Sequence, residues 1–256
     1  MKQTCEIGCE CERIEQMIRH TLWSSGAKGF VVGISGGVDS ALAAALCARA
    51  VGGEHVMGIA LPSPVTPEAD LSDGRDLCAA FDVPFKTISI EPMLSAFAGM
   101  EDFEKTPYLS GNLMARIRMT TLYYHANRLH YLVCGTSNRS EYMLGYSTKY
   151  GDSGVDLLPL GALYKTEVYG LARELELPKE IIDKPPSAGL WDGQTDEREL
   201  GMTYADLDKA LIAIESGKTE NISPEISTRV RALVADSAHK RSVPPVCEIK
   251  SCKRSQ

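Results

Sequence analysis

The feature that most constrains this chain is a glycine-rich turn between a short apolar run and an alanine-rich segment. The apolar run is Phe30–Val32, the alanine-rich segment runs from Ala41 to Ala50, and the turn between them is Gly33-Ile34-Ser35-Gly36-Gly37-Val38-Asp39-Ser40. β-Branched residues after a glycine predict a buried strand, whereas closely spaced alanines and leucines predict a helix. The chain must therefore pass from strand to helix through a turn of very small residues.

Such a turn is suited to binding an anion. Its backbone N–H groups lie beside a helix N-terminus, where the helix dipole favours negative charge, and its glycines let a phosphate approach closely. Asp39 is the exception, because a carboxylate repels a neighbouring phosphate unless a cation lies between them. We therefore expect a magnesium ion shared by Asp39 and bound phosphates. The alternative without a ligand is a plain glycine turn in which Ser35 or Asp39 caps the helix.

Two common phosphate-binding patterns do not fit this turn, because the lysine of a Walker loop is missing and the spacing differs from G-x-G-x-x-G. The segment Ser35–Ser40 instead resembles the pyrophosphate loop of the ATP-pyrophosphatase superfamily. That resemblance implies that ATP is cleaved between its α and β phosphates and that a substrate oxygen is adenylated. It identifies a superfamily and leaves the substrate open.

Strands and helices alternate through about the first ninety residues. The pattern predicts strands at 30–32, 55–61 and 84–90, with helices at 41–50 and 67–81. This alternation requires parallel pairing with right-handed crossovers, and so predicts a doubly wound, Rossmann-like α/β fold with helices on both faces of the sheet. Ligands bind beyond the carboxyl ends of strands in such sheets, which is where the glycine turn lies.

A second glycine turn follows a fourth predicted strand, 130–136. Thr136 ends this strand and can reach a phosphate or ribose oxygen, and Glu141 follows five residues later. Considered alone, Glu141 is an ordinary solvated glutamate at a helix start. A single aspartate is a poor magnesium site, however, so we expect Glu141 to complete the site with Asp39.

The second half of the chain combines amphipathic helices with two polar loops. Helices are predicted at 12–24, 110–129, 164–177, 203–214 and 223–237, the last two at the surface. The buried side of the 110–129 helix is predicted to carry Leu109, Leu113, Ile117 and Tyr124. The loop at 145–156 precedes a short apolar strand, and the loop at 184–200 is interpreted as a lid. Lys165 begins a helix, where a cation opposes the dipole unless it faces an anion.

Several separated blocks, in the same order along the chain, resemble the NAD synthetase family over residues 12–246. The blocks are Gly135-Thr136 with Glu141, 149–152 with Asp156, 158–160, 165–168, 186–190, 194–197, and His239-Lys240-Arg241 with Val243-Pro244. The resemblance implies an adenine nucleotide alpha-hydrolase-like fold and a homodimer with its dinucleotide site at the subunit interface. The segment 62–66 matches only loosely, so adenine contacts there stay unassigned.

The resemblance also assigns roles residue by residue. It implies that the 33–40 turn holds the ATP phosphates, that Asp39 and Glu141 ligate magnesium, and that ATP is contacted by Thr136, Lys165 and Ser187. Deamido-NAD would be contacted by Arg116, Lys149 and Asp156, and from the partner subunit by His239 and Lys240.

The implied reaction amidates the nicotinate carboxylate of deamido-NAD through an acyl adenylate, giving NAD, AMP and pyrophosphate. Asp39 and Lys165 would support the adenylation, and Asp152 or Asp156 would bind ammonium and accept its proton. About 28 residues precede the first strand, which is too few for a glutaminase domain, so we expect free ammonia as the nitrogen source unless a separate glutaminase subunit supplies it.

Charge and cysteine content limit the alternatives. A net charge of −7 argues against general nucleic-acid binding, and thus against the RNA-thiolating members of the superfamily. The polar N-terminus predicts a cytoplasmic protein. Of eight cysteines, Cys47, Cys78 and Cys134 are expected in the core. Cys5, Cys9, Cys11, Cys247 and Cys252 are expected as exposed thiols on flexible ends, 1–11 and 247–256, around a single 12–246 domain.

Two other functions remain open from the sequence alone. One is a sulfur transferase of the same superfamily that uses Cys134 or the terminal cysteines. The other is a nucleotide-binding sensor that retains the fold without catalysis, which the presence of Asp39, Glu141 and Lys165 disfavours.

Overall fold

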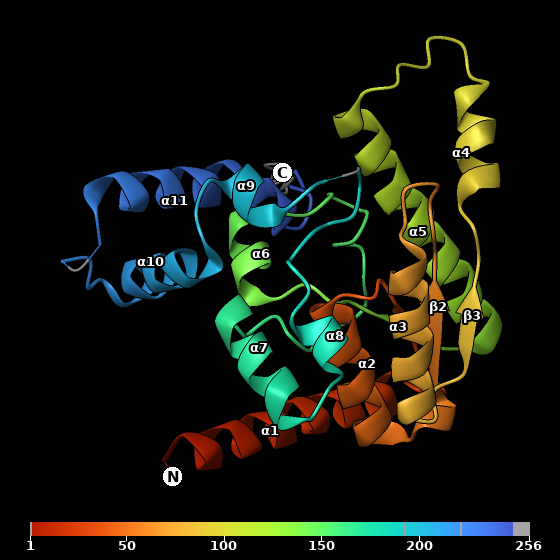
Figure 1. Ribbon diagram of the computed structural model, residues 1–256, viewed down its shortest axis with the longest axis horizontal. Helices are drawn as coiled ribbons and strands as arrows, with labels where there is room; N and C mark the ends of the chain where they lie inside the picture. The colour runs from red at the N-terminus through yellow and green to blue at the C-terminus, as the bar shows by residue number, and fades with distance from the viewer. Residues whose placement is uncertain (1, 192, 221, 248–256) are drawn as a thin grey trace, which may run out of the picture.

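A parallel sheet forms the centre of the protein. The computed structural model describes residues 2–191, 193–220 and 222–247 (Figure 1). Its strands are β1 (Phe30–Gly33), β2 (Val56–Ala60), β3 (Phe85–Thr87) and β4 (Leu132–Cys134), in the order β3-β2-β1-β4. Phe30 pairs with Val56 on one side and with Leu132 on the other, and every pairing is parallel. The doubly wound α/β fold is therefore confirmed.

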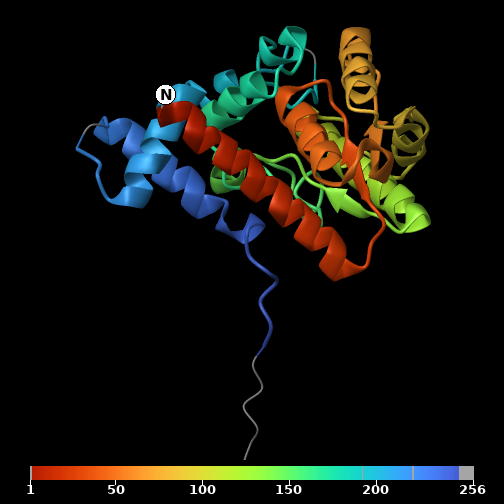
Figure 2. The ribbon, with the colours of Figure 1, turned by 90° about the horizontal axis from the view of Figure 1, so that it is seen from below.

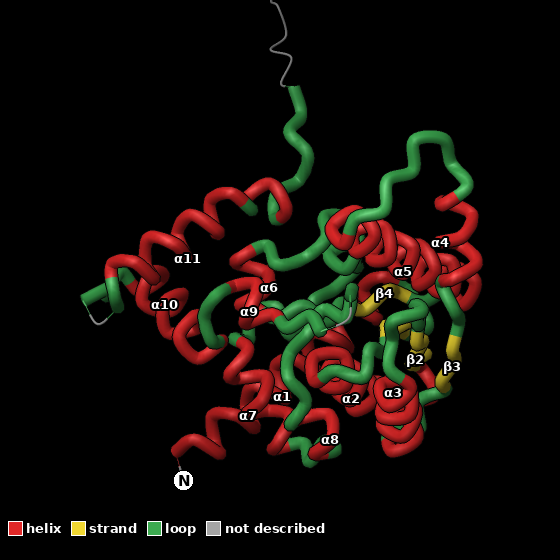
Figure 3. The backbone as a smooth tube through the Cα atoms, turned by 45° about the horizontal axis from the view of Figure 1, so that its top comes forward, coloured by secondary structure: helices red, strands yellow, loops and turns green. Residues whose placement is uncertain are grey.

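Helices cover both faces of this sheet (Figure 3). Helices α2 (Val38–Val51) and α3 (Glu68–Ala80) cover one face, and α1 (Lys2–Ser25) packs against α2. Helices α4 (Glu91–Ala98) and α5 (Pro107–Leu129) lie on the other face. Side chains alternate accordingly along β1, because Phe30 and Val32 join the apolar cluster around α2 whereas Val31 joins the cluster around α5.

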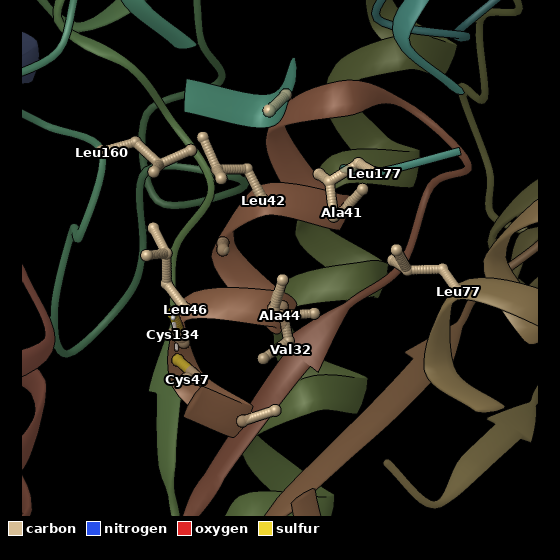
Figure 4. Close-up of a cluster of buried hydrophobic side chains, with 14 of the residues drawn as sticks. Val32, Ala41, Leu42, Ala44, Leu46, Cys47, Leu77, Cys134, Leu160 and Leu177 are labelled. Atoms are coloured by element: carbon tan, nitrogen blue, oxygen red, sulfur yellow. Dashed lines mark hydrogen bonds between the residues drawn. The ribbon is translucent and has the colours of Figure 1, made fainter. Parts of the chain in front are cut away.

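The alanine-rich helix α2 is the most deeply buried helix of the described chain, with every residue from Ser40 to Ala48 buried. Its small side chains let the sheet, α1 and α7 approach closely from different sides. The close-up shows Leu42, Leu46 and their neighbours interdigitating, with the thiols of Cys47 and Cys134 pointing at each other 3.6 Å apart (Figure 4). Cys47, Cys78 and Cys134 are buried, as predicted.

The remaining helices follow β4. They are α6 (Arg139–Leu144), α7 (Lys165–Glu174), α8 (Lys179–Ile182), α9 (Asp196–Leu200), α10 (Tyr204–Ser216) and α11 (Pro224–Asp236), with short 3₁₀ turns at Gly53–His55 and Ala238–Lys240. Helices α10 and α11 are more than surface helices, because Leu207, Leu211 and Val230 build an apolar cluster of their own. Beyond Lys240 the described chain leads away from the body (Figure 2). No described helix is both long and apolar enough to span a membrane.

The N-terminal helix corrects part of the sequence analysis. It begins at Lys2 rather than at residue 12, and Cys11 is buried in the main core instead of exposed. Cys11, Ile14 and Ile18 share one face at helical spacing, so the thiol faces α2 and burial raises its pKa. Cys9 and Cys247 are exposed as predicted, whereas the side chains of Cys5 and Cys252 and the tail after residue 247 lie outside the described residues.

Two other local predictions are wrong. Leu109 and Tyr124 lie on the exposed side of α5. Ile117 is buried as predicted, and Met114 and Ala115 share its face. The small residues Gly111 and Ala115 set this face, because they admit close neighbours that a larger side chain would exclude. The strand expected before residue 160 is only an isolated parallel bridge between Cys134 and Leu157.

Because Ile18 is fully buried between α1 and the core, Ile18→Ala should lower the free energy of unfolding by about 2–5 kcal/mol. The matched control is Ile212→Ala on α10, where the side chain is 46% exposed and the expected loss is below about 1 kcal/mol. Urea unfolding of both variants measures the difference. Equal losses would mean that α1 contributes little to the core.

Candidate active site

The strand order places the candidate site. The chain adds β2 and β3 on one side of β1 and then returns to add β4 on the other side. The connections that follow β1 and β4 therefore run to opposite sides and separate. A crevice forms at such a reversal, beyond the carboxyl ends of the strands. The turns after β1 (33–40) and after β4 (135–141) therefore meet here.

The first turn is held in shape by its own serines. The hydroxyl of Ser40 donates to the carbonyl of Gly37 (2.9 Å) and accepts from the backbone N–H of Ser35 (3.2 Å). The N–H of Gly37 in turn donates to the Ser35 hydroxyl at 3.2 Å. Ser40 is buried, so its role in this structure is to brace the turn.

Gly36 shows why this turn requires glycine. Its φ is +79°, and a Cβ atom at this position would lie 2.6 Å from the carbonyl oxygen of Asp70 on α3. A side chain would therefore be strained by the backbone conformation and would collide with the neighbouring helix. The close approach fixes the start of α3 against the turn.

Three predicted residues converge beside the turn. The ammonium of Lys165, at the start of α7, lies 2.5 Å from Oδ2 of Asp39 and 3.2 Å from Oε1 of Glu141. Lys165 is 2% exposed, so this is a buried ion triad built from three separate segments. The structure thus brings Asp39 and Glu141 together, as expected, but it also pairs Lys165 directly with both carboxylates, which the sequence had placed against the ATP phosphates only.

With both of its carboxylates ionised, the triad would carry an excess of negative charge. The pKa of Glu141 is accordingly raised to about 8: burial is the largest cause, Lys165 opposes the rise, and the charges of Asp39 and Asp196 add to it. For Lys165, burial alone would lower the pKa, but Asp39 and Glu141 outweigh this and leave the pKa raised. One ammonium therefore does not balance the surrounding carboxylates.

Asn138 is a site residue that the sequence analysis missed. It is fully buried, and its amide donates to Oδ1 of Asp39 at 2.9 Å while its side-chain oxygen accepts from the backbone N–H of Glu141 at 3.0 Å. This makes it the N-cap of α6 in a capping box with Glu141. The N-x-x-E spacing before a predicted helix was the signal that could have found it.

Asp208, from α10, is a second missed residue. It is 2% exposed, and its carboxylate accepts from the hydroxyl of Ser140 and from the N–H of Thr166 at 2.9 Å. Ser140 accepts from the N–H of Lys165 at 3.0 Å. Asp208 therefore joins the first turns of α6 and α7, which carry Glu141 and Lys165, and its negative charge suits the N-terminus of α7.

Oxygen donors beside uncompensated negative charge fit a hard divalent cation such as magnesium. In the described part of the chain, no three His, Cys, Asp or Glu side chains gather into a metal site of their own. Magnesium is commonly held by one or two carboxylates together with substrate phosphates and water, and the pair Asp39 and Glu141 matches that donor set.

The predicted dinucleotide-binding residues divide into two places. Lys149 Nζ lies 3.3 Å from Nδ1 of His239, and a guanidinium nitrogen of Arg116 donates to the carbonyl of Lys149 at 3.3 Å. Lys240 donates to the carbonyls of Gly145 and Ser147, in the same loop. His239 and Lys240 thus lie beside Lys149 of their own chain, and a contribution to a partner's site stays a prediction.

Asp156 lies apart from this basic group. Its Oδ1 accepts from the hydroxyl of Tyr123 at 3.0 Å and its Oδ2 from the N–H of Val133 at 2.7 Å, so both oxygens support the fold. Asp152 accepts from the N–H of Thr148 at 2.7 Å. Burial of the Asp152 carboxylate raises its pKa, and the Thr148 hydrogen bond offsets part of that rise.

The remaining predicted ATP contacts lie on two loops. Thr136 is half-buried in the turn between β4 and α6, whereas Ser187 is exposed and accepts from the N–H of Gly189 at 3.1 Å. Ser187 belongs to the segment 184–195. Lys184, at the start of this segment, contacts the glycine turn, and Leu190 lies against Gly111 of α5. The last residues of the predicted lid are helical, as α9.

Comparisons with known proteins agree with this geometry. A family model described as NAD synthase matches residues 10–244. An NH(3)-dependent NAD(+) synthetase from Methanoregula boonei is 54% identical over 240 residues, covering 94% of this chain and 96% of the relative.

Solved structures are also similar. The NMN synthetase from Francisella tularensis has a TM-score of 0.87 and 35% identity, covering 95% of this chain and 99% of that one. The NH3-dependent NAD synthetase from Campylobacter jejuni has a TM-score of 0.83 and 33% identity, covering 94% and 99%.

The raised pKa of Glu141 predicts a pH-dependent stability. The pKa of Glu141 is 4.5 in the unfolded chain and about 8 in the folded protein, so between these pH values only the folded protein keeps this proton. The free energy of unfolding should therefore fall as the pH rises through this range. In a chelating buffer, the free energy of unfolding of the parent protein should fall by up to about 1.4 kcal/mol per pH unit more than that of Glu141→Gln. Urea unfolding at pH 6, 7 and 8 measures both slopes, and equal slopes would contradict the raised pKa of Glu141.

Proposed function

The chain belongs to the NAD synthase family, and we propose that it amidates deamido-NAD with ammonia and ATP, giving NAD, AMP and pyrophosphate. The observation that carries this proposal is the buried group of Asp39, Glu141 and Lys165 beside the glycine turn. The turn can bind phosphates, and the three residues add one cation and two carboxylates beside it. The chain also matches ammonia-using NAD synthetases over nearly its full length.

The chemistry explains why ATP is needed. A carboxylate is a poor electrophile, so one of its oxygens first attacks the α-phosphorus of ATP and pyrophosphate leaves. Ammonia then attacks the carbonyl carbon of the acyl adenylate, and AMP departs with the carboxylate oxygen while the attacking nitrogen loses a proton. The N–H groups of the 33–40 turn would bind the phosphates, and Lys165 would offset the charge that develops on pyrophosphate.

We propose that Asp39 and Glu141 hold a magnesium ion together with the ATP phosphates. The convergence of these two carboxylates at a single ammonium supports this assignment, because their ionised forms outnumber the cation beside them. When bound, the ion would supply further positive charge beside the departing pyrophosphate. Asn138 keeps Asp39 oriented, because its amide donates to one carboxylate oxygen. Thr136 and Ser187 are proposed to contact ATP from neighbouring loops.

The basic group around the 145–152 loop is proposed for the dinucleotide substrate. Arg116, Lys149 and Lys240 bring positive charge to this loop, which suits the phosphates of a dinucleotide, and His239 lies beside Lys149. Asp156 is the weakest of the proposed contacts, because both of its oxygens already accept hydrogen bonds.

Asp152 is the better candidate for binding ammonium and accepting its proton. Its raised pKa makes it a stronger base than an ordinary aspartate, and it lies on the same loop as Lys149. The oxygens of Asp156, by contrast, are engaged by Tyr123 and Val133.

Two parts of the proposal rest on the family resemblance. We propose a homodimer whose interface contains the dinucleotide site, and a cytoplasmic location. The exposed Tyr108 and Tyr124 on α5 are compatible with an interface on that helix. The sulfur-transferase alternative is disfavoured for Cys134, because this residue is buried and because its hydrogen bond with Cys47 and its burial raise its pKa, which makes it a poor nucleophile. For the terminal cysteines this alternative stays open.

A mononucleotide acid is the second candidate substrate. It is favoured by the similarity to the Francisella tularensis NMN synthetase, which by its name makes a mononucleotide. The same carboxylate would be activated in either case, and only the adenylate half of the substrate differs.

The direct test incubates the protein with magnesium-ATP, ammonium and either deamido-NAD or nicotinate mononucleotide. We expect NAD, AMP and pyrophosphate in equal amounts with deamido-NAD, at a catalytic efficiency at least about tenfold above that with the mononucleotide. Chromatography of the products measures all of them. Preference for the mononucleotide would support the second candidate, and absence of coupled AMP formation with both would contradict the reaction class.

Asp39→Asn tests the metal and phosphate site. The variant keeps the shape of the side chain but removes the charge, so turnover should fall at least about 100-fold while the fold is retained. The matched control is Asp183→Asn, at an exposed residue after α8. Full activity of Asp39→Asn would remove Asp39 from the metal site.

A further inference from the structure

Lys184 lies at a junction that the proposed reaction does not yet use. Its ammonium donates to the carbonyl oxygen of Gly36 (3.1 Å), to Oδ1 of Asp70 (2.7 Å) and to Oδ2 of Asp73 (2.8 Å). The side chain is 27% exposed, so these contacts are shielded but reachable by water. A single lysine therefore joins the glycine turn, helix α3 and the start of the 184–195 segment.

The contact with Gly36 acts on the phosphate-binding turn through one peptide unit. In a planar trans peptide, the carbonyl of Gly36 and the N–H of Gly37 point in opposite directions. Fixing the carbonyl on the Lys184 side therefore turns the N–H toward the other side, where the Ser35 hydroxyl accepts from it. A cation on the carbonyl also polarises the peptide and makes that N–H a stronger donor.

The position needs such support because Gly36 has a positive φ and no side chain to anchor it. The backbone of Asp70 lies so close that a Cβ on Gly36 would collide with it. Asp70 and Asp73, three residues apart on α3, share one helix face and together hold the ammonium. Burial would lower the pKa of Lys184, but these two carboxylates raise it, so the lysine stays charged at neutral pH.

We propose that Lys184 is a positioning residue for ATP, which orients the Gly36–Gly37 peptide so that the Gly37 N–H can bind a phosphate. The same ammonium anchors the segment that carries Ser187, so the turn and that loop are held together as one phosphate-binding unit. This inference rests on the proposed function for the identity of the nucleotide.

The test measures binding of magnesium-ATP by calorimetry, which does not require turnover. Lys184→Met should raise the dissociation constant for ATP about tenfold, in line with losing one charge-assisted hydrogen bond. The dissociation constant for deamido-NAD should change less than about twofold, because its proposed contacts lie elsewhere. Lys179→Met, at an exposed lysine on α8, is the matched control and should bind ATP like the parent.

Two further variants separate positioning from general loosening. The first adds Asp70→Asn and Asp73→Asn to Lys184→Met. This triple variant should bind ATP no more weakly than Lys184→Met alone, because the three residues act as one junction. Lys184→Arg, which keeps the charge, should restore part of the lost affinity. Unchanged ATP binding by Lys184→Met, an equal loss for ATP and deamido-NAD, or full additivity with the aspartate variants would each overturn the proposal.

The readout also distinguishes this inference from the proposed function. A parent protein that binds ATP but makes no NAD would refute the reaction while leaving the Lys184 comparison valid. A parent that makes NAD with unchanged ATP binding in Lys184→Met would refute only the positioning role.

Discussion

The buried ammonium of Lys165, held between the carboxylates of Asp39 and Glu141, is the interaction on which the site depends. Removing Lys165 would leave its two partner carboxylates without a compensating cation in the interior, at a cost of about 3–5 kcal/mol. Asn138 and Asp208 keep the group assembled, because one orients Asp39 and the other joins the helices that carry Glu141 and Lys165. When both carboxylates are ionised, a magnesium ion would balance the negative charge that Lys165 leaves over.

The sheet topology makes this meeting possible. Residues 39, 141 and 165 are far apart in sequence, yet the order β3-β2-β1-β4 sets the turns after β1 and β4 side by side. Helix α2 begins within the first turn, at Val38, and is buried from Ser40 to Ala48, so the turn rests on a rigid support. The apolar cluster of α10 and α11 likewise supports α6 and α7, because Asp208 on α10 accepts a hydrogen bond from the start of α7.

The sequence was sufficient for the parallel sheet, the glycine turn and the approach of Glu141 to Asp39, because each depends on local patterns and known strand-edge geometry. It did not predict that Lys165 pairs directly with both carboxylates. It was not sufficient where tertiary packing decides. Leu109 and Tyr124 have the apolar character of buried residues but face outward on α5, and Cys11 lies in the core because α1 continues further than its polar residues suggest. Lys184 could not be found either, since its partners Gly36, Asp70 and Asp73 meet it only in the folded chain.

The central claim is that this site activates a substrate carboxylate by transferring AMP to it. The most direct measurement uses deamido-NAD labelled with oxygen-18 in the nicotinate carboxylate, followed by mass spectrometry of the products. Attack of the carboxylate on the α-phosphorus predicts one labelled oxygen in each AMP and none in pyrophosphate. Unlabelled AMP, or label in inorganic phosphate released with ADP, would contradict the account.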